Sequence, residues 1–388
     1  MVAIRQFVSS YVAGRWIVPG LPRLRLADWR GGPMGRSLGR LGRLLQAPAG
    51  VKPLNLALQG GGAHGAFTWG VLDRLLEDGR FRFGAVSGTS AGAMNAVILA
   101  AGLLDGGRDG ARARLEAFWR AVGEAARFSP LRSSAFDRNG AAPRREFSAS
   151  HMAFDMMTRW LSPYQFNPLD YNPLRDLLER SVDFKRLRRE SRLQLYLSAT
   201  DVADGKTRVF RTAELSIEAV LASACLPQMH RAVKVGRRHY WDGGYSANPA
   251  LMPLVRDGAA DTLLVQINPT SEAALPTTAQ EIAGRVNRIV FNEPLRREIE
   301  LIAHGRALAT EGFSIGGRLR GRLRRHRFHH IEAAKYTEDL GEASKMSPDW
   351  TLLAHLRDCG RAAADGWLRK HYRSVGRRAT VDLAAKFL

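Results

Sequence analysis

The sequence predicts an α/β fold of three layers, in which helices cover both faces of a mostly parallel central sheet and a helical C-terminal extension follows. Short apolar runs typical of buried strands alternate with helical segments between residues 54 and 270. The chain has 388 residues and is 45% hydrophobic, which is enough to bury a substantial core. Beyond residue 275 the spacing of apolar residues is mainly helical.

Each predicted element has a local reason. The strands are short apolar runs bounded by glycine or polar residues, whereas the helices repeat apolar residues every three or four positions. Asp78-Gly79 ends the first helix, and Asp204-Gly205 and Gly236 mark the turns of two hairpins. The predicted strands are 54–58, 85–87, 193–200, 207–211, 232–235, 239–241, 262–267 and 328–331, and the predicted helices before residue 270 are 66–77, 91–102, 112–126 and 215–224.

We expect three parts in the chain: a basic N-terminal arm at 1–50, a main domain at 54–270, and a helical region at 275–388 that packs on this domain. The arm contains eight arginines and one acid, which gives +7 of the formal net charge of +21. Four interpretations stay open for it. It is an arm that touches an anionic membrane, a targeting segment, an over-long translation start, or a poorly ordered tail without a role.

Residues 128–172 interrupt the alternation of strands and helices. They contain four prolines, at positions 130, 143, 163 and 168. We expect a long loop or a helical insertion here. The segment either forms a lid or is a surface excursion without a role.

The remaining composition limits the classes of site and location. The two distant cysteines, Cys225 and Cys359, form no disulfide framework and no four-ligand zinc site, so we expect them to be reduced and buried in a cytoplasmic protein. The sequence shows no metal site and indicates no cofactor. No apolar run reaches the roughly 18 residues that span a bilayer. The positive net charge favours anionic partners.

Ser90 lies at the centre of the first chemical motif, Gly88-Thr89-Ser90-Ala91-Gly92. This G-x-S-x-G element follows the predicted strand 85–87 and opens an apolar helix. A tight strand-to-helix turn exposes the serine hydroxyl and crowds its neighbours, so small residues must flank it. The helix N-terminus beside Ser90 also favours negative charge. The motif therefore predicts a nucleophilic serine.

A glycine-rich loop, Gln59-Gly60-Gly61-Gly62-Ala63-His64-Gly65, also joins a predicted strand to a helix. Successive glycines let backbone N–H groups turn toward a ligand. Such a loop can hold either a phosphate or a developing oxyanion. It lacks the Gly-Lys-Ser/Thr ending of a P-loop. A dinucleotide site would also require an acidic residue at a strand end about 20 positions later, and residues 79–82 do not supply one.

Asp242 opens the third motif, directly after the predicted strand 239–241. Gly243 and Gly244 remove side chains beyond it, so the carboxylate can approach a serine hydroxyl. Taken alone, the motif is equally typical of an ordinary Asp-Gly turn.

In this order the three motifs resemble those of the patatin-like phospholipases. That family has a G-G-G-x-[basic]-G loop, a G-x-S-x-G element and a D-G-[GA] element, which correspond here to Gly60–Gly65, Gly88–Gly92 and Asp242–Gly244. Residues 222–227 form a further family-like segment. The resemblance covers roughly residues 54–270, and it implies the patatin-like form of the three-layer fold.

The resemblance also implies a catalytic dyad, with Ser90 as the nucleophile and Asp242 as its base. The N–H groups of Gly60, Gly61 and Gly62 would bind the oxyanion, in a loop completed by Ala63, His64 and Gly65. His64 stands where the family usually has Arg or Lys. This departure implies weaker oxyanion stabilisation or a pH-dependent activity, and we interpret His64 as support for the loop.

The implied function is hydrolysis of carboxylic ester bonds in lipids, with peripheral contact to anionic membranes. Apolar residues of the insertion either touch lipid or form buried core; they are Phe154, Met156, Met157, Trp160, Tyr164 and Phe166. One alternative is a soluble carboxylesterase or acyltransferase that uses the same Ser90. Another is a non-catalytic module that binds anionic membranes through the basic run 318–327. Nucleic acid is not an expected partner, because no motif of a nucleic-acid-binding fold is present. The sequence does not indicate an oligomeric state.

Overall fold

The computed structural model describes residues 50–126, 157–158, 160–271, 275–310, 317–337, 340 and 342–388. The chain divides into Met1–Val51 and Lys52–Leu388, and the second unit carries all the elements below. Residues 1–49 of the predicted arm and residues 128–156 of the predicted insertion lie outside the described residues. The predicted division between residues 270 and 275 stays a prediction.

The described residues form a mostly parallel sheet of eight strands. These are β1 (Lys52–Leu58), β2 (Phe81–Gly88), β3 (Gln194–Asp201), β4 (Thr207–Arg211), β5 (Val233–Val235), β6 (Arg238–Asp242), β7 (Asp261–Gln266) and β8 (Arg327–Glu332). The strand order is β5-β6-β3-β2-β1-β7-β8, and β4 pairs with β3 outside this path. The strands from β3 to β8 in this order are parallel, whereas β4, β5 and β6 pair antiparallel at one edge.

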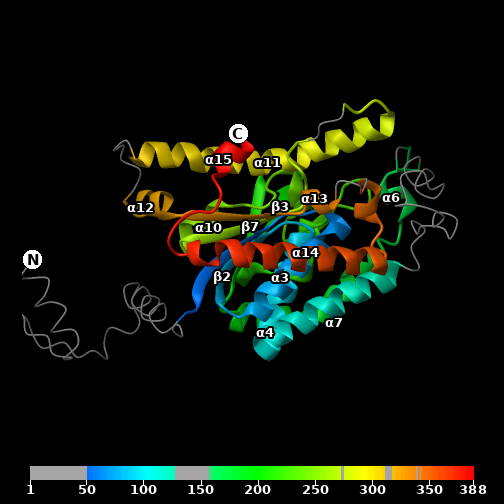
Figure 1. Cartoon of the computed structure of the whole chain (residues 1–388). Helices are drawn as coiled ribbons and strands as arrows, with labels where there is room; N and C mark the ends of the chain where they lie inside the picture. Colours follow the sequence, from blue (N-terminus) through cyan, green and yellow to red (C-terminus); the bar gives the residue numbers. More distant parts are fainter. Residues whose placement is uncertain are drawn as a thin grey trace, which may run out of the picture. The chain divides into compact units, whose positions relative to one another are not determined.

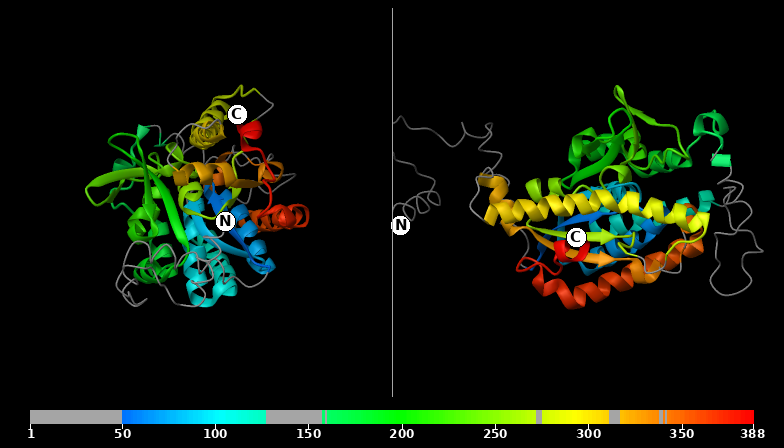
Figure 2. Two further views of the ribbon diagram at one scale, coloured as in Figure 1. Left: turned by 90° about the vertical axis from the view of Figure 1, so that its left-hand side faces the viewer. Right: turned by 90° about the horizontal axis from the view of Figure 1, so that it is seen from above.

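Helices cover both faces of the sheet (Figures 1 and 2). On one face lie α3 (Gly65–Asp78), α4 (Ala91–Ala125) and α14 (Trp350–His371); on the other lie α10 (Met252–Asp257), α11 (Ala279–Thr310), α12 (Gly317–Arg325) and α15 (Leu383–Phe387). A hydrophobic core lies on each face of the sheet. Successive side chains of β1 point to opposite faces, so Leu56 and Leu58 pack in one core and Ala57 packs in the other. The three-layer fold is therefore confirmed.

The remaining helices and turns lie at the edges of these layers. They are α6 (Pro163–Phe166), α7 (Pro173–Ser181), α8 (Phe184–Glu190), α9 (Ile217–Ser223), α13 (Ala334–Thr337) and the 3-10 turns η2 (Gly62–His64), η6 (Thr212–Glu214), η7 (Gly243–Tyr245), η8 (Glu342–Met346) and η9 (Tyr372–Ser374). The predicted helices 91–102 and 112–126 correspond to the two parts of α4, which are separated by non-helical backbone at Gly106 and Gly107. Gly107 has a φ of 60°, which glycine tolerates best.

The C-terminal region completes the sheet, because β8 pairs in parallel with β7 along its whole length. The predicted strand 328–331 is thus confirmed. His329 and Arg327 of β8 donate to the carboxylate of Asp261, which is buried at the start of β7. Burial raises the pKa of Asp261, but these hydrogen bonds outweigh it and hold the pKa below its usual range. This network joins two strands and gives His329 a structural partner.

Candidate active site

Strand register brings the ends of β2 and β6 to the same level on either side of β3. Gly88, the last residue of β2, pairs with Leu197 of β3. Asp242, the last residue of β6, pairs with Ala199, two positions further along β3. Ser90 lies two positions beyond Gly88. The predicted serine and carboxylate therefore emerge at the same end of β3.

Ser90 occupies a strained strand-to-helix turn. Its φ is 54°, and Asp170 is the only other described non-glycine residue with a positive φ. A Cβ atom at Gly92 would lie 2.2 Å from the carbonyl oxygen of Leu58. A Cβ atom at Gly88 would lie 2.5 Å from the carbonyl oxygen of Gly92. Both motif glycines are required by close backbone contacts, and Ser90 alone among residues 89–92 stays partly exposed.

A second serine holds the turn in place. The backbone N–H of Ser90 donates to Ser223 Oγ over 3.0 Å. Ser223 is fully buried at the end of α9, within the segment 222–227. The hydrogen bond fixes the peptide that precedes the serine side chain.

Replacing Ser223 by Ala should lower the free energy of unfolding by about 1–2 kcal/mol and lower kcat more than it changes KM. The reason is that the Ser90 N–H loses its acceptor in a buried site, and the strained turn loses its anchor. Urea unfolding and steady-state hydrolysis of a soluble ester measure the two effects. Ser191→Ala, which removes a hydroxyl bonded to Leu193 far from the turn, is the control. An unchanged kcat would contradict the anchoring role.

Asp242 is fully buried, and its backbone N–H donates to the carbonyl of Cys225 over 2.7 Å. Its Oδ1 accepts a 2.7 Å hydrogen bond from the N–H of Gly244. Burial raises the pKa of Asp242 to about 7, while hydrogen bonding from Gly244 and from the Ser90 side chain acts in the opposite direction. Oδ2 has no partner with full hydrogen-bond geometry among the described residues. The Ser90 side chain lies close enough to the carboxylate to act on the pKa of Asp242.

The glycine-rich loop lies directly against Ser90. A Cβ atom at Gly60 would lie 2.9 Å from the Cβ of Ser90 and 2.9 Å from the carbonyl oxygen of Thr89. The N–H of Gly60 donates to Asn248 Oδ1 over 2.7 Å. All three sequence motifs thus meet at one place, although the Gly60 N–H is already occupied by a side chain.

The directions of the Gly61 and Gly62 N–H groups follow from the hydrogen bonds that the carbonyl groups of the same two peptides accept. The Gly60 carbonyl accepts from Asn268 Nδ2 over 3.1 Å, and the Gly61 carbonyl accepts from the N–H of His64 over 3.1 Å. In a planar trans peptide the N–H points away from the carbonyl. The N–H groups of Gly61 and Gly62 consequently point away from these partners, at the start of η2, where backbone donors have no acceptor within the turn.

His64 turns its side chain toward the C-terminal region. It is 2% exposed, and its Nε2 lies 2.7 Å from the Oγ of Ser344 in η8. This contact is compatible with a supporting role in the loop. Ala63 is buried beside it, and Gly65 lies close to Ala91, whose Cβ would be 2.6 Å from a Cβ at position 65.

Several polar residues around the loop were not identified from the sequence. They are Asn248, Asn268, Ser344 and Lys345, each of which hydrogen-bonds the loop or one of its partners. Asn248 lies a few positions after the Asp242 motif, which is a weak local signal. Lys345 has no such local signal, because it lies far from the loop in the sequence and only the fold brings it there.

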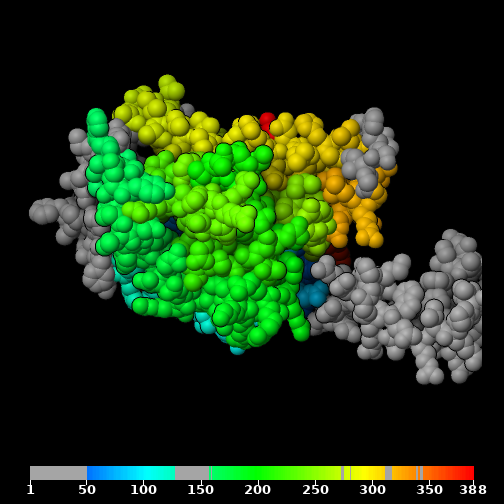
Figure 3. Space-filling model, turned by 180° about the vertical axis from the view of Figure 1, so that it is seen from behind, coloured from blue at the N-terminus to red at the C-terminus, as the bar shows by residue number. Residues whose placement is uncertain are grey.

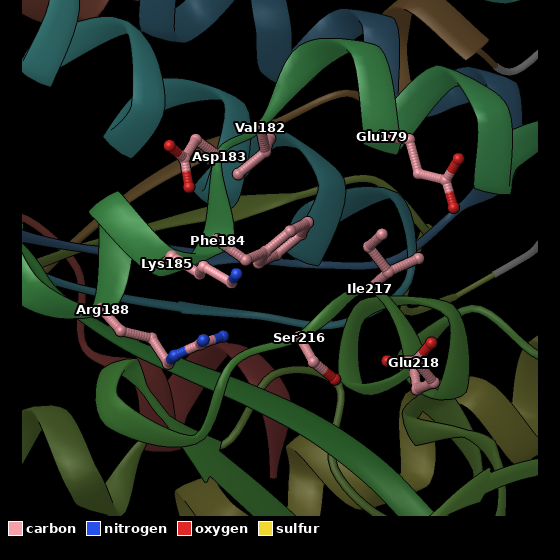
Figure 4. Close-up of a pocket in the computed structure, with 9 residues that line it drawn as sticks. All are labelled: Glu179, Val182, Asp183, Phe184, Lys185, Arg188, Ser216, Ile217 and Glu218. Carbon is pink, nitrogen blue, oxygen red and sulfur yellow. The ribbon is translucent and has the colours of Figure 1, made fainter.

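A surface pocket of about 340 Å³ lies elsewhere, between α7, α8 and the start of α9 (Figure 4). Its lining mixes acidic and basic side chains and includes none of the motif residues. Asp183 and Ser216 in this lining already cap α8 and α9 by accepting backbone hydrogen bonds. The pocket therefore has a structural explanation and does not mark the site.

The described residues contain no group of His, Cys, Asp and Glu arranged to hold a metal ion. Within the same part of the chain, no helix combines the length and hydropathy needed to span a bilayer. Cys225 is buried and reduced, and burial raises the pKa of its thiol to about 12. Cys359 is also reduced but half-buried.

The sheet, the turn at Ser90 and the adjacent glycine loop define the class, an α/β protein with a nucleophile elbow. The model of the patatin-like phospholipase family matches residues 56–255. The chain belongs to this family, and its fold is the patatin fold.

Comparison with solved structures gives remote likenesses. The crystal structure of VipD from Legionella pneumophila has a TM-score of 0.37 and 16% identity, over 84% of this chain and 68% of that chain. The ExoU–SpcU complex from the type III secretion system of Pseudomonas aeruginosa has a TM-score of 0.24 and 14% identity, over 83% of this chain and 76% of that chain. No curated protein matches the sequence.

Proposed function

We propose that the protein is a lipid acyl hydrolase that cleaves carboxylic ester bonds with a Ser90–Asp242 dyad through an acyl-enzyme. The observation that carries this proposal is the buried Asp242 carboxylate beside the partly exposed Ser90, on a turn whose backbone is strained. Family membership supports the lipid substrate.

In the proposed reaction, Asp242 removes the proton of the Ser90 hydroxyl as its oxygen attacks the acyl carbonyl. The negative charge that develops on the carbonyl oxygen is stabilised by the N–H groups of Gly61 and Gly62. Gly60 instead positions the loop, because its own N–H is bonded to Asn248. Asp242 then protonates the leaving alcohol, and later activates the water that hydrolyses the acyl-enzyme. The raised pKa of Asp242 makes its carboxylate a stronger base than an exposed one.

Contact with a lipid surface is part of the proposal, and two exposed apolar segments support it. Residues 160–171 expose Trp160, Tyr164, Leu169 and Tyr171, so Trp160 and Tyr164 of the predicted insertion are not core residues. The first half of α11 exposes Ile282, Val286, Ile289 and Val290, whose spacing places them on one helical face. Figures 1 and 3 show both segments at the same end of Lys52–Leu388.

Contacts connect both segments to Asp242. Phe291, which follows the exposed apolar face of α11, packs against Tyr245 in a tilted arrangement with ring centroids 4.8 Å apart, and it lies against Gly244. Tyr164 and Pro168 accept hydrogen bonds from Arg231, whose own carbonyl accepts from Cys225. Aromatic and aliphatic side chains near basic residues suit the interface of an anionic bilayer.

The double variant Ile282→Ser with Ile289→Ser should reduce hydrolysis of anionic phospholipid vesicles about tenfold, because less apolar area enters the interface. Hydrolysis of a short nitrophenyl ester should not change. The matched control is Leu301→Ser with Leu308→Ser, two exposed leucines in the second half of α11. Equal losses on vesicles and on the soluble ester would reject a lipid-docking role for this face.

The test of the proposed function is lipid-product mass spectrometry with purified wild-type protein and Ser90→Ala. Release of fatty acid by the wild type alone supports the proposal. Activity restricted to short soluble esters would indicate a carboxylesterase. Absence of both hydrolysis and labelling of Ser90 by a fluorophosphonate would indicate a binding module without catalysis.

A further inference from the structure

The turn η8 contacts the glycine-rich loop at two points and contacts Asn268, a hydrogen-bond partner of the loop, at a third, although nearly 280 residues separate η8 from the loop in the sequence. Ser344 Oγ lies 2.7 Å from His64 Nε2. The backbone carbonyl of Lys345 lies against Gly62, where an added Cβ would come within 2.3 Å of it. Lys345 Nζ donates to Asn268 Oδ1 over 2.6 Å. The C-terminal region therefore fixes the position of the loop.

Asn268 connects the Lys345 ammonium to the loop backbone. It is 2% exposed, and its Nδ2 donates to the carbonyl of Gly60 over 3.1 Å. Its backbone N–H donates to Gln59 Oε1 over 2.8 Å. Lys345, the Asn268 amide and the Gly60 carbonyl thus form a continuous chain of hydrogen bonds, in which each donor increases the polarity of the next.

This chain ends on the peptide that carries the Gly61 N–H. A hydrogen bond to the Gly60 carbonyl withdraws electron density from the peptide and makes its N–H a better donor. The same bond fixes the direction in which that N–H points.

We propose that Lys345 is a positioning residue for the oxyanion loop, which it aligns and polarises through Asn268. The loop itself carries His64 as its basic residue, so Lys345 supplies the permanent positive charge from another part of the chain. This inference rests on the proposed function of Ser90 and the loop, and it assigns a role in that site to the C-terminal region.

The test compares Lys345→Met, which keeps the length of the side chain but removes its charge, with Lys345→Arg, which keeps the charge. On a short nitrophenyl ester, Lys345→Met should lower kcat about tenfold and change KM less than about twofold, since the effect falls on the transition state. Lys345→Arg should recover most of the loss. Lys345→Met should also weaken inhibition by a trifluoromethyl ketone, whose serine adduct carries an oxyanion, about as much as it lowers kcat.

The control variant is Lys370→Met, which removes an exposed lysine from the last turn of α14. It should leave kcat and inhibition unchanged. Thermal unfolding of each variant separates misfolding from a local effect. If wild type is active and Ser90→Ala is not, but Lys345→Met equals wild type, this inference fails while the proposed function stands. If wild type has no Ser90-dependent activity, the proposed function fails, and the inference fails with it.

Discussion

Replacing Ser90 by Ala is expected to lower the rate of ester hydrolysis by about 10⁵–10⁶-fold, to a level set by the uncatalysed reaction and by residual binding. The reason is that the alanine cannot form the acyl-enzyme, and the buried Asp242 alone activates water poorly. Fatty-acid release from phospholipid and from a nitrophenyl ester measures the loss. Labelling by a fluorophosphonate measures the nucleophile directly.

A loss of activity in Ser90→Ala is informative only if the variant is folded. The alanine keeps the backbone N–H that bonds Ser223, so the cooperative unfolding transition should remain. Ser191→Ala should be labelled by the probe and hydrolyse ester like wild type. Persistent labelling or hydrolysis in Ser90→Ala would show that another residue is the nucleophile.

The parts of the fold that depend on local patterns were predicted from the sequence. Strand ends followed by glycines predicted the three turns, since a glycine pair or a G-x-S-x-G element restricts the backbone within a few residues. The strand β2 was predicted too short, as 85–87 in place of Phe81–Gly88. Arg82 and Gly84 interrupt its apolar pattern, because this part of the strand is partly exposed.

The parts of the site that depend on distant pairing could not be predicted from local sequence patterns. Strand register decides that Asp242 and Ser90 meet, and no residue near either position encodes the pairing of Ala199 with Asp242. Similarly, Lys345 reaches the loop only because β8 joins the sheet and returns the chain to the same end. Resemblance to a family supplied the first of these contacts as an expectation. It supplied no expectation for the second, because η8 carries no motif.

Replacing Asp242 by Asn should abolish activity and, above neutral pH, stabilise the fold. The amide is not a base, so kcat should fall by about 10⁴-fold or more. In the wild type, burial raises the pKa of Asp242 from 3.8 to about 7, so the folded state holds this proton more tightly than the unfolded state. The stability that the protonated Asp242 carboxyl group contributes is fully present below about pH 4 and is lost as pH rises to about 7. Asn keeps the acceptor for the Gly244 N–H and avoids the buried charge.

Urea unfolding of wild type and Asp242→Asn at pH 5 and pH 8 measures this difference. The variant should gain about 2–3 kcal/mol relative to wild type between the two pH values, since each unit of pKa difference corresponds to about 1.4 kcal/mol. The wild-type rate should rise with pH through about 7, as Asp242 ionises and becomes a base. Asp257→Asn, which removes a carboxylate from the more exposed end of α10, is the control and should not show the same gain. A stability gap that does not change with pH, together with a rate that is flat between pH 5 and 8, would mean that Asp242 is neither a strained buried charge nor the base.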